Sequence, residues 1–561
     1  MILRLTPLLA GLFFLPLSAA EKPNVLLLCV DDLKPVLGCY GDPSARTPNL
    51  DRLAAHALRL DRAYCNQAVC SPSRNALMTG LRPQTLGIYN LPTNFRKSRP
   101  DAITLAQHFQ ANGYRTEALG KIFHTGHGNT EDEASWTVPH FRPDAPQYLL
   151  PENAAPKSAN NTKTKGNAKG QGKKPYGAPT EAADVPDDAY ADGKIALEAV
   201  KRLEAARSQP GPFFLAVGFL KPHLPFVAPQ KYWDLHDPTT LPMPTRNTPP
   251  EGAPDCGPQF GGELRQYKNV PQGNAPFDEA LTRHLIHGYY AATSYLDACA
   301  GLVLNALEKN GFADNTILVF WGDHGWHLGD HGMWCKHTNY ENAARIPLLV
   351  SVPGKSPAVS DALVETVDLY PTLAELAGLP APGGLDGRSF ASLLEDPAAA
   401  HRDHAIHVFP RGDLLGRAIR TDRFRLVEWK RIGASPDTAV LELYDYQADP
   451  GETKNLAGER PEILADLRKI LSSHPEAKPQ IHPNATPAKS EKTRPEGPSK
   501  DRTALFLQRD KDQDGKLSRD EFLHHQPDPD EAPKRFPRFD SNGDGFLSEE
   551  EFVTSGKGTR S

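Results

Sequence analysis

The sequence predicts an α/β fold, in which helices cover a sheet of buried strands. Four short, continuously apolar runs have the length and composition of covered strands, at residues 24–30, 212–219, 316–321 and 347–352. Apolar residues at helical spacing alternate with these runs, at residues 195–203 and 281–307. Strands that alternate with long helices are typical of a sheet with helices packed on it.

Composition and charge bound the class of protein. The chain has 561 residues, of which 39% are hydrophobic and 24% charged, a balance that can bury a large core. Its 63 Lys and Arg against 69 Asp and Glu give a formal net charge of -6. A net negative charge does not indicate the basic surface that a polyanion needs, so we expect no binding of nucleic acid.

The first twenty residues have the layout of a secretory signal peptide. Arg4 precedes an apolar run at residues 8–17, and small residues at 18–20 come before Glu21. A buried N-terminal element is the alternative, but a charged, non-periodic start follows the expected cleavage point. No later stretch reaches the ~18–20 consecutive apolar residues of a membrane helix. We therefore expect a secreted or periplasmic protein without a membrane span.

Changes in composition and in the spacing of apolar residues divide the chain into five predicted segments. These are a signal peptide at 1–20, an α/β domain at 21–370, a smaller α+β subdomain at 371–474, a linker at 475–500 and a separate unit at 501–561. The α/β domain contains an insertion at 153–176 with six Lys and no acidic residue, which favours a solvated loop over a substrate-facing one. Within the subdomain, residues 418–429 have the composition of a strand. The linker holds six prolines and almost no large apolar residue.

The clearest motif is CSPSR at residues 70–74, followed by NALMTG at 75–80. Taken alone, it could be a packing cysteine before a proline turn. It resembles the C-x-P-S-R signature of type I sulfatases, a family of the alkaline phosphatase superfamily. The resemblance implies a large mixed sheet covered by helices, with a smaller C-terminal α+β subdomain. It also implies that a maturation enzyme oxidises Cys70 to formylglycine, which would explain why the chain has an odd number of cysteines, seven.

Formylglycine gives this signature a chemical purpose. A sulfate monoester resists attack by anions, whereas the hydrate of an aldehyde offers an oxygen nucleophile. Its sulfated adduct can then collapse by carbon–oxygen cleavage, so that one hard step becomes two easier ones. A serine at the same place would form a stable sulfate ester, and turnover would stop at that intermediate.

Acidic residues follow two of the predicted strands. Asp31 and Asp32 come after the first strand, and Asp323 and His324 follow another. Carboxylate oxygens suit a hard cation such as calcium, and one His among acids does not make a zinc site. Either pair alone could be a helix cap or a turn, so the argument depends on their joint occurrence. The resemblance implies that these four residues bind one Ca²⁺ together with the formylglycine from Cys70.

Cationic residues stand at further places that match the family, in GKIFH at 120–124, in KPH at 221–223 and at Lys336. Any one of them alone would be better explained as a surface Lys or a core His. The resemblance implies that Arg74, Lys121 and His124 hold or deprotonate the formylglycine hydrate. It implies that His223 and Lys336 face the sulfate, where one of them protonates the leaving alcohol.

The resemblance extends from about residue 22 to residue 474 and is closest to the iduronate-2-sulfatase group. FFLAVGFLKPHLPF at 213–226, DHGWHLGDHGMWCK at 323–336 and GKIFHTG at 120–126 carry it. It implies hydrolysis of sulfate esters on a sulfated polysaccharide or oligosaccharide. The alternatives are a generic arylsulfatase and a catalytically inactive, calcium-stabilised carbohydrate-binding protein. A phosphoester hydrolase of the same superfamily would need a Thr or Ser nucleophile and paired zinc ligands.

The tail repeats a calcium-binding spacing in two loops. The residues at loop positions 1, 3, 5, 7 and 12 are Asp510, Asp512, Asp514, Lys516 and Glu521, and then Asp540, Asn542, Asp544, Phe546 and Glu551. This is the spacing of the EF-hand, in which position 7 contributes only a backbone carbonyl. A dockerin-like pair is the nearest alternative, but Glu at position 12 favours an EF-hand pair. We expect a small all-α unit that binds two Ca²⁺.

Overall fold

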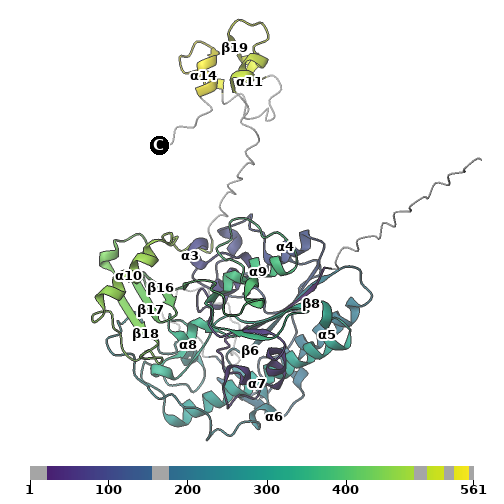
Figure 1. Ribbon diagram of the computed structural model, residues 1–561, viewed down its shortest axis with the longest axis vertical. Coiled ribbons are helices and arrows are strands. Elements are labelled where there is room, and N and C mark those ends of the chain that lie inside the picture. Colours follow the sequence, from purple (N-terminus) through teal and green to yellow (C-terminus); the bar gives the residue numbers. More distant parts are fainter. Residues whose placement is uncertain (1–21, 155–175, 485–501, 524–535, 538, 555–561) are drawn as a thin grey trace, which may run out of the picture. The chain divides into compact units, whose positions relative to one another are not determined.

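The computed structural model describes residues 22–154, 176–484, 502–523, 536–537 and 539–554 (Figure 1). The chain divides into two compact units, Met1–Ala488 and Lys489–Ser561. The predicted signal peptide, most of the lysine-rich insertion and the later part of the predicted linker lie outside the described residues.

A mixed sheet forms the centre of the first unit, and in the described part of the chain it has seven strands in the order β13-β2-β12-β8-β1-β6-β4. The strands are β1 (Asn24–Asp31), β2 (Leu58–Leu60), β4 (Arg115–Gly120), β6 (Phe213–Pro222), β8 (Thr316–Gly322), β12 (Leu348–Ser351) and β13 (Ala358–Ser360). β1 pairs in parallel with β6 and β8, whereas β12 is antiparallel to β8. The predicted α/β class is confirmed.

Helices cover both faces of this sheet, which is why β1 is apolar along nearly its whole length. Its alternate side chains enter two different cores. Leu26 and Leu28 pack in the core that contains α5 (Ala191–Ala206) and α7 (Glu279–Lys309). Val25 and Leu27 pack in the core formed with α2 (Cys70–Thr79), α4 (Leu105–Ala111) and α9 (Leu369–Leu376).

A second, antiparallel sheet has the strand order β15-β16-β17-β18, at His404–Arg411, Leu414–Thr421, Phe424–Lys430 and Val440–Asp445. Helix α10 (Pro461–Ser472) packs on it through Leu467 and Leu471. The strand composition expected at 418–429 is confirmed, but a turn at residues 422–423 divides these residues between β16 and β17. That turn contains neither Gly nor Pro, so composition did not reveal it. Helix α9 crosses the predicted boundary at residue 370 and packs against the first sheet.

The smaller elements of this unit connect and extend these layers. They are α1 (Pro48–Ala54), β3 (Ala63–Tyr64), α3 (Pro83–Leu86), β5 (Thr180–Ala183), β7 (Phe226–Pro229), α6 (Gln230–Trp233), β9 (His327–Leu328), β10 (Trp334–Cys335), α8 (Glu341–Ala344), β11 (Arg345–Ile346) and β14 (Val364–Glu365). All seven cysteines are free thiols, and Cys29 is buried in β1 as expected.

Residues 475–484, expected to begin the linker, instead lie against the first unit. The backbone N–H of Lys478 donates to the carbonyl of Gln84 at 3.0 Å, and that of Ile481 donates to Gly87 at 2.8 Å. The Tyr89 hydroxyl donates to the carbonyl of Lys478 at 2.7 Å. Composition could not reveal this attachment, because backbone groups and the polar side chains of Glu476 and Gln480 make it, rather than large apolar side chains.

The second unit contains α11 (Arg502–Arg509), β19 (Lys516–Ser518), α12 (Arg519–Leu523), β20 (Phe546–Ser548) and α14 (Glu549–Thr554). Phe506 and Phe522 contribute to a small core of its own. β19 and β20 pair in antiparallel fashion, with Leu517 opposite Leu547. The unit is helical as expected, with one short two-stranded ribbon that joins the two loops.

Glu365 binds two arginines in the interior of the first unit. Its carboxylate accepts hydrogen bonds from Arg82 Nε at 2.7 Å and from Arg402 Nη1 at 2.8 Å. Burial alone would raise the pKa of Glu365, but Arg82 and Arg402 lower it from 4.5 to about 2. The ion pairs therefore persist in moderately acidic solution.

We expect Glu365→Gln to lower the free energy of unfolding by about 3 kcal/mol at neutral pH, because the largely buried Arg82 loses its carboxylate partner and Arg402 keeps only Asp368. The folded pKa lies below the unfolded one, so this stabilisation is complete above about 4.5 and is lost as the pH falls toward 2. Chemical denaturation at neutral pH and near pH 3 measures it. Glu395→Gln, at an exposed pair with Lys355, is the control. A loss of the same size at both pH values would contradict the assignment.

Candidate active site

The ends of three neighbouring strands bring polar residues together at one edge of the large sheet. β6, β1 and β8 are adjacent and parallel, so their C-terminal ends lie side by side. Asp31 ends β1, His223 follows β6 and Asp323 follows β8. Asp32 has a φ of 61°, in the left-handed region, and its N–H donates to Asp323 Oδ1 at 3.0 Å. The turn after β1 thus fixes two carboxylates in one place.

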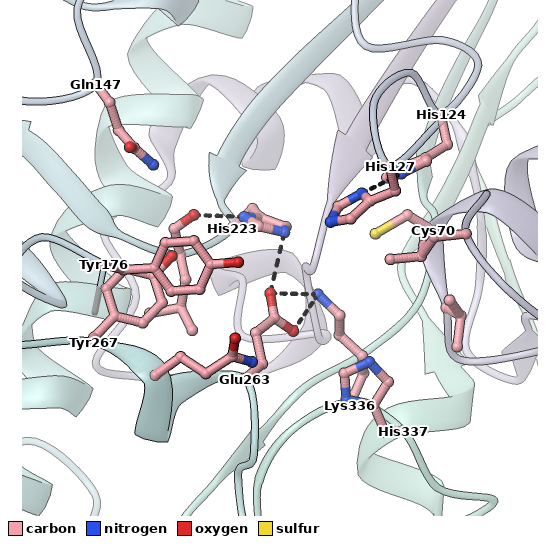
Figure 2. A pocket seen from close by; sticks show the side chains of 14 residues that line it. Cys70, His124, His127, Gln147, Tyr176, His223, Glu263, Tyr267, Lys336 and His337 are labelled. Atoms are coloured by element: carbon pink, nitrogen blue, oxygen red, sulfur yellow. Dashed lines mark hydrogen bonds and ion pairs between the residues drawn. The ribbon is translucent and has the colours of Figure 1, made fainter. Parts of the chain in front are cut away.

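Cys70 is the first residue of α2, and its thiol points toward the same edge. Cys70 Sγ lies 3.5 Å from His324 Nε2. The side chain is only 3% exposed, and a cavity of about 400 Å³ opens onto it (Figure 2). The cysteine of the CSPSR motif therefore lies at the bottom of a ligand-sized pocket.

The thiol belongs to a cluster of groups that could bind a metal ion. Donor atoms of Asp31, Cys70, Asp323 and His324 all lie within 4.8 Å of one another. An overlapping set contains Asp31, Asp32, Cys70 and His223. The structure thus brings together the five predicted metal-binding residues, although neither set contains all of them.

The electrostatics of this cluster favour a bound cation. Burial raises the pKa of Asp32 well above its usual range, although Lys336 opposes the shift. Burial would lower the pKa of His324, but Asp323 and Asp32 raise it to about 10. Asp31 Oδ1 is buried and makes no hydrogen bond. Carboxylate oxygens with one unsatisfied atom suit a hard cation, so the residues fit Ca²⁺.

Arg74 and Lys121 hold the acidic residues from one side. Arg74 is fully buried one turn into α2, and its Nε donates to Asp323 Oδ2 at 2.9 Å. Its Nη2 lies 3.5 Å from Asp31 Oδ1. Lys121 forms an ion pair with the other oxygen of Asp31. Burial opposes the ionisation of Asp31, yet Lys121, His223 and Arg74 keep its pKa well below the usual range. Asp31 therefore remains a carboxylate.

Lys336 and His223 face the cavity from the opposite side. Lys336 Nζ lies 3.0 and 2.9 Å from the two carboxylate oxygens of Asp32. His223 Nδ1 lies 2.5 Å from the carbonyl of Leu224, so its Nε2 faces the cavity. Burial, together with Lys336, lowers the pKa of His223 to about 3. The pKa of Lys336 is raised well above its usual value by Asp32 and Glu263, in spite of burial. Lys336 is therefore the proton-bearing cation of this pair.

Two residues that the sequence did not single out take part in the site. Glu263 lies between His223 Nε2, at 3.4 Å, and Lys336 Nζ, at 3.0 Å (Figure 2). His127 Nδ1 lies 3.2 Å from His124 Nε2. Glu263 stands in an irregular loop, where no periodicity or motif could indicate it. The spacing of two imidazoles in HTGH was the signal for His127 that sequence reasoning passed over.

The two loops of the second unit have matching internal contacts. Asp510 Oδ2 accepts from the N–H of Gly515 at 2.9 Å, and Asp540 Oδ2 accepts from Gly545 at 3.0 Å. Glu521 closes the first loop, where its Oε1 accepts from the N–H of Lys511. Donor atoms of Asp510, Asp512 and Glu521 lie within 4.8 Å of one another. This arrangement fits an oxygen-preferring cation.

Comparison with a solved structure defines the fold of the first unit. A protein in complex with its substrate D-glucosamine-2-N,6-O-disulfate has a TM-score of 0.62 and 22% sequence identity to this chain. The match covers 81% of this chain and 97% of the other. At that identity the likeness establishes the fold alone, and the first unit has an α/β fold of the alkaline phosphatase type.

The particular family follows from comparison with family models. The sulfatase model matches residues 23–379, more than half of the chain, and the chain therefore belongs to the sulfatase family. It is a sulfuric ester hydrolase. A model of the N-sulphoglucosamine sulphohydrolase C-terminal region matches residues 329–476, and EF-hand models match 503–524 and 534–554.

Curated relatives agree with the family match. Iduronate 2-sulfatase of Homo sapiens is 32% identical over 519 residues, which cover 78% of this chain and 92% of that protein. Iduronate 2-sulfatase of Mus musculus is 37% identical over 402 residues, covering 65% and 70% respectively. Among the described residues, no helix combines the length and the apolar character that crossing a membrane requires.

Proposed function

We propose that this protein hydrolyses sulfate esters on a carbohydrate, using a formylglycine made from Cys70 and a Ca²⁺ bound beside it. The convergence of Cys70 Sγ with donor atoms of Asp31, Asp323 and His324 within 4.8 Å supports the proposal most directly. The oxygens of the formylglycine hydrate would stand where Cys70 Sγ stands now. The hydrate supplies the nucleophile, and Ca²⁺ supplies positive charge next to the sulfate.

Neighbouring residues would prepare the nucleophile. Arg74 and Lys121 fix the carboxylates of Asp31 and Asp323 and contribute positive charge close to residue 70. Burial and Lys121 lower the pKa of His124 to about 3, so its imidazole is neutral. One ring nitrogen of His124 contacts His127, while Nδ1 is buried without a partner. His124 is thus a neutral ring with one nitrogen available to accept a hydrogen bond from the hydrate.

The opposite side of the cavity would receive the sulfate and the leaving alcohol. Lys336 offers an N–H donor to a sulfate oxygen or to the leaving oxygen, and His223 presents Nε2 to the same space. Glu263 orients both side chains through its two carboxylate oxygens. The aromatic rings of Tyr176 and Tyr267 line the cavity and offer flat surfaces to a sugar.

We further propose a 2-O-sulfated uronate, in an oligosaccharide or polysaccharide, as the substrate. The likeness to iduronate 2-sulfatases supports this choice. A carboxylate next to the sulfate would add a charge-assisted contact to the cationic pocket. The proposal includes secretion by the peptide at residues 1–20, a formylglycine-generating maturation enzyme, and calcium in the two EF-hand loops.

The substrate is tested by comparing sulfate release from 2-O-sulfated uronate disaccharides, other sulfated glycans and nitrophenyl sulfate in one calcium buffer. We expect the uronate disaccharide to have the highest kcat/KM, by about tenfold or more, because remote contacts position its sulfuryl group. If nitrophenyl sulfate is best and no glycan is desulfated, the protein is a generic arylsulfatase. If no substrate releases sulfate, the chain is an inactive, carbohydrate-binding member of its family.

A further inference from the structure

The cavity at Cys70 adjoins a second one, and the two share a wall. The first has a volume of about 400 Å³ and the second about 470 Å³. Glu263 and His337 line both cavities. The rest of the second cavity is lined chiefly by Phe260, Arg265, Asn274 and residues 409–412. Each volume lies within the range of ordinary ligand pockets. A ligand too large for the first cavity could therefore continue into the second.

Arg411, at the end of β15, brings a cation to the second cavity. Its Nε donates to the carbonyl of Cys256 at 3.1 Å, and its Nη2 donates to the carbonyl of His337 at 2.9 Å. The guanidinium lies 5.0 Å from the centre of the Phe409 ring. No carboxylate of the described residues lies within ion-pair distance of Arg411, whereas Arg431, in the loop after β17, pairs with Asp413 at 2.6 Å. Arg411 is thus held in place by two carbonyls, and the described residues offer it no counter-ion.

The other two charged side chains of the second cavity, Glu263 and Arg265, already have partners. Glu263, in the shared wall, forms an ion pair with Lys336 and lies 3.4 Å from Nε2 of the neutral His223. Arg265 donates to the carbonyls of Phe260, Pro271 and Ala275, so it shapes the wall and has little left to offer a ligand. An anion that enters the second cavity would therefore meet the N–H groups of Arg411 as its strongest partner.

The backbone also links Arg411 to the reaction site. The carbonyl that it binds belongs to His337, the residue directly after Lys336. Lys336 faces the first cavity, and Arg411 lines the second. Two cations in adjoining pockets match two anionic groups on adjacent units of one chain-like ligand.

We propose that the second cavity is a subsite for the sugar next to the sulfated unit, and that Arg411 binds an anionic group, a carboxylate or a sulfate, on that sugar. This inference depends on the proposed function, since it assumes a carbohydrate substrate in the first cavity. It makes charge on the neighbouring sugar a determinant of specificity.

The test compares kcat/KM for three disaccharides that carry the same 2-O-sulfated uronate, with a neighbouring sugar that is neutral, carboxylated or sulfated. We expect the unchanged enzyme to prefer a charged neighbour, and the preferred one identifies the anion. Arg411→Gln should reduce that preference about tenfold or more, mainly through KM. Arg411→Lys should restore part of it. Arg431→Gln, which removes an exposed arginine outside the cavity, should keep the original preference.

A second variant acts on the cavity without changing Arg411. Asn274 is exposed in the wall of the second cavity, so the Asn274→Trp variant should fold, and its indole should fill the cavity. We expect the same loss of preference for a charged neighbouring sugar as with Arg411→Gln. If the enzyme releases sulfate but neither variant alters the preference, the subsite is refuted and the proposed function stands.

A binding measurement separates the inference from catalysis. Calorimetry with full-length Cys70→Ala and the charged disaccharides should show tight binding that Arg411→Gln weakens about tenfold. If no substrate is ever desulfated but this weakening occurs, the subsite holds and the proposed function fails. Equal affinity with and without Arg411 would overturn the subsite.

Discussion

Cys70→Ser is expected to lower steady-state sulfate release on the order of 10³-fold or more and to leave a sulfated enzyme behind. A serine hydroxyl at the start of α2 can attack the sulfuryl group, but its ester lacks the neighbouring hydroxyl that expels sulfate by carbon–oxygen cleavage. Steady-state assays measure the loss, and mass spectrometry of the whole protein after incubation with substrate measures the retained sulfuryl group.

The matched control for this variant is Cys39→Ser, at a partly exposed cysteine outside the cavity, which should retain activity. The unchanged protein provides the decisive observation. A peptide mass spectrum that shows an intact Cys70 thiol in fully active enzyme would refute the formylglycine mechanism.

Asp323→Asn is expected to reduce kcat/KM by roughly 10³-fold and to remove one bound Ca²⁺ per chain. Asp323 accepts from Arg74 Nε through one carboxylate oxygen and from the N–H of Asp32 through the other. The amide keeps the shape of the side chain but removes its negative charge, which weakens both the hold on Arg74 and the attraction for the metal. Charge stabilisation by a metal accounts for several kcal/mol of a barrier, so the loss should be large.

Kinetics at saturating calcium and calcium content by atomic emission test this prediction. Asp361→Asn provides the control, because Asp361 is exposed and lies outside the cluster. The EF-hand loops should keep their calcium in both variants. If Asp323→Asn retains full activity and the original calcium content, Asp323 is not a ligand of the proposed ion.

Strand ends were the part of the site that the sequence could predict. Asp31 and Asp323 follow apolar runs, and adjacent parallel strands bring such ends together, so a local pattern determined a long-range contact. The CSPSR motif also allowed a prediction, because residues 70 and 74 are one helical turn apart on α2 and so lie on the same face of the helix.

Contacts that depend on irregular backbone could not be predicted from the sequence. Glu263 reaches Lys336 from a loop that has no periodicity, and His127 reaches His124 with a φ of 52°, in the left-handed region. The attachment of residues 475–484 depends in part on backbone groups, which every sequence possesses. Composition and spacing describe side chains, and they carry little information about such pairings.

The burial of Cys70 limits the time at which the nascent chain can be modified. Cys70 is 3% exposed in the folded protein, so any enzyme that oxidises it must act before the fold closes. His324, against which the thiol packs, is synthesised 254 residues later. At ~5–20 residues per second, that stretch of chain takes roughly 13–50 s to make. The number of residues between Cys70 and His324 thus sets the time during which Cys70 can be oxidised. Faster synthesis or earlier folding would yield protein that is well folded but unmodified.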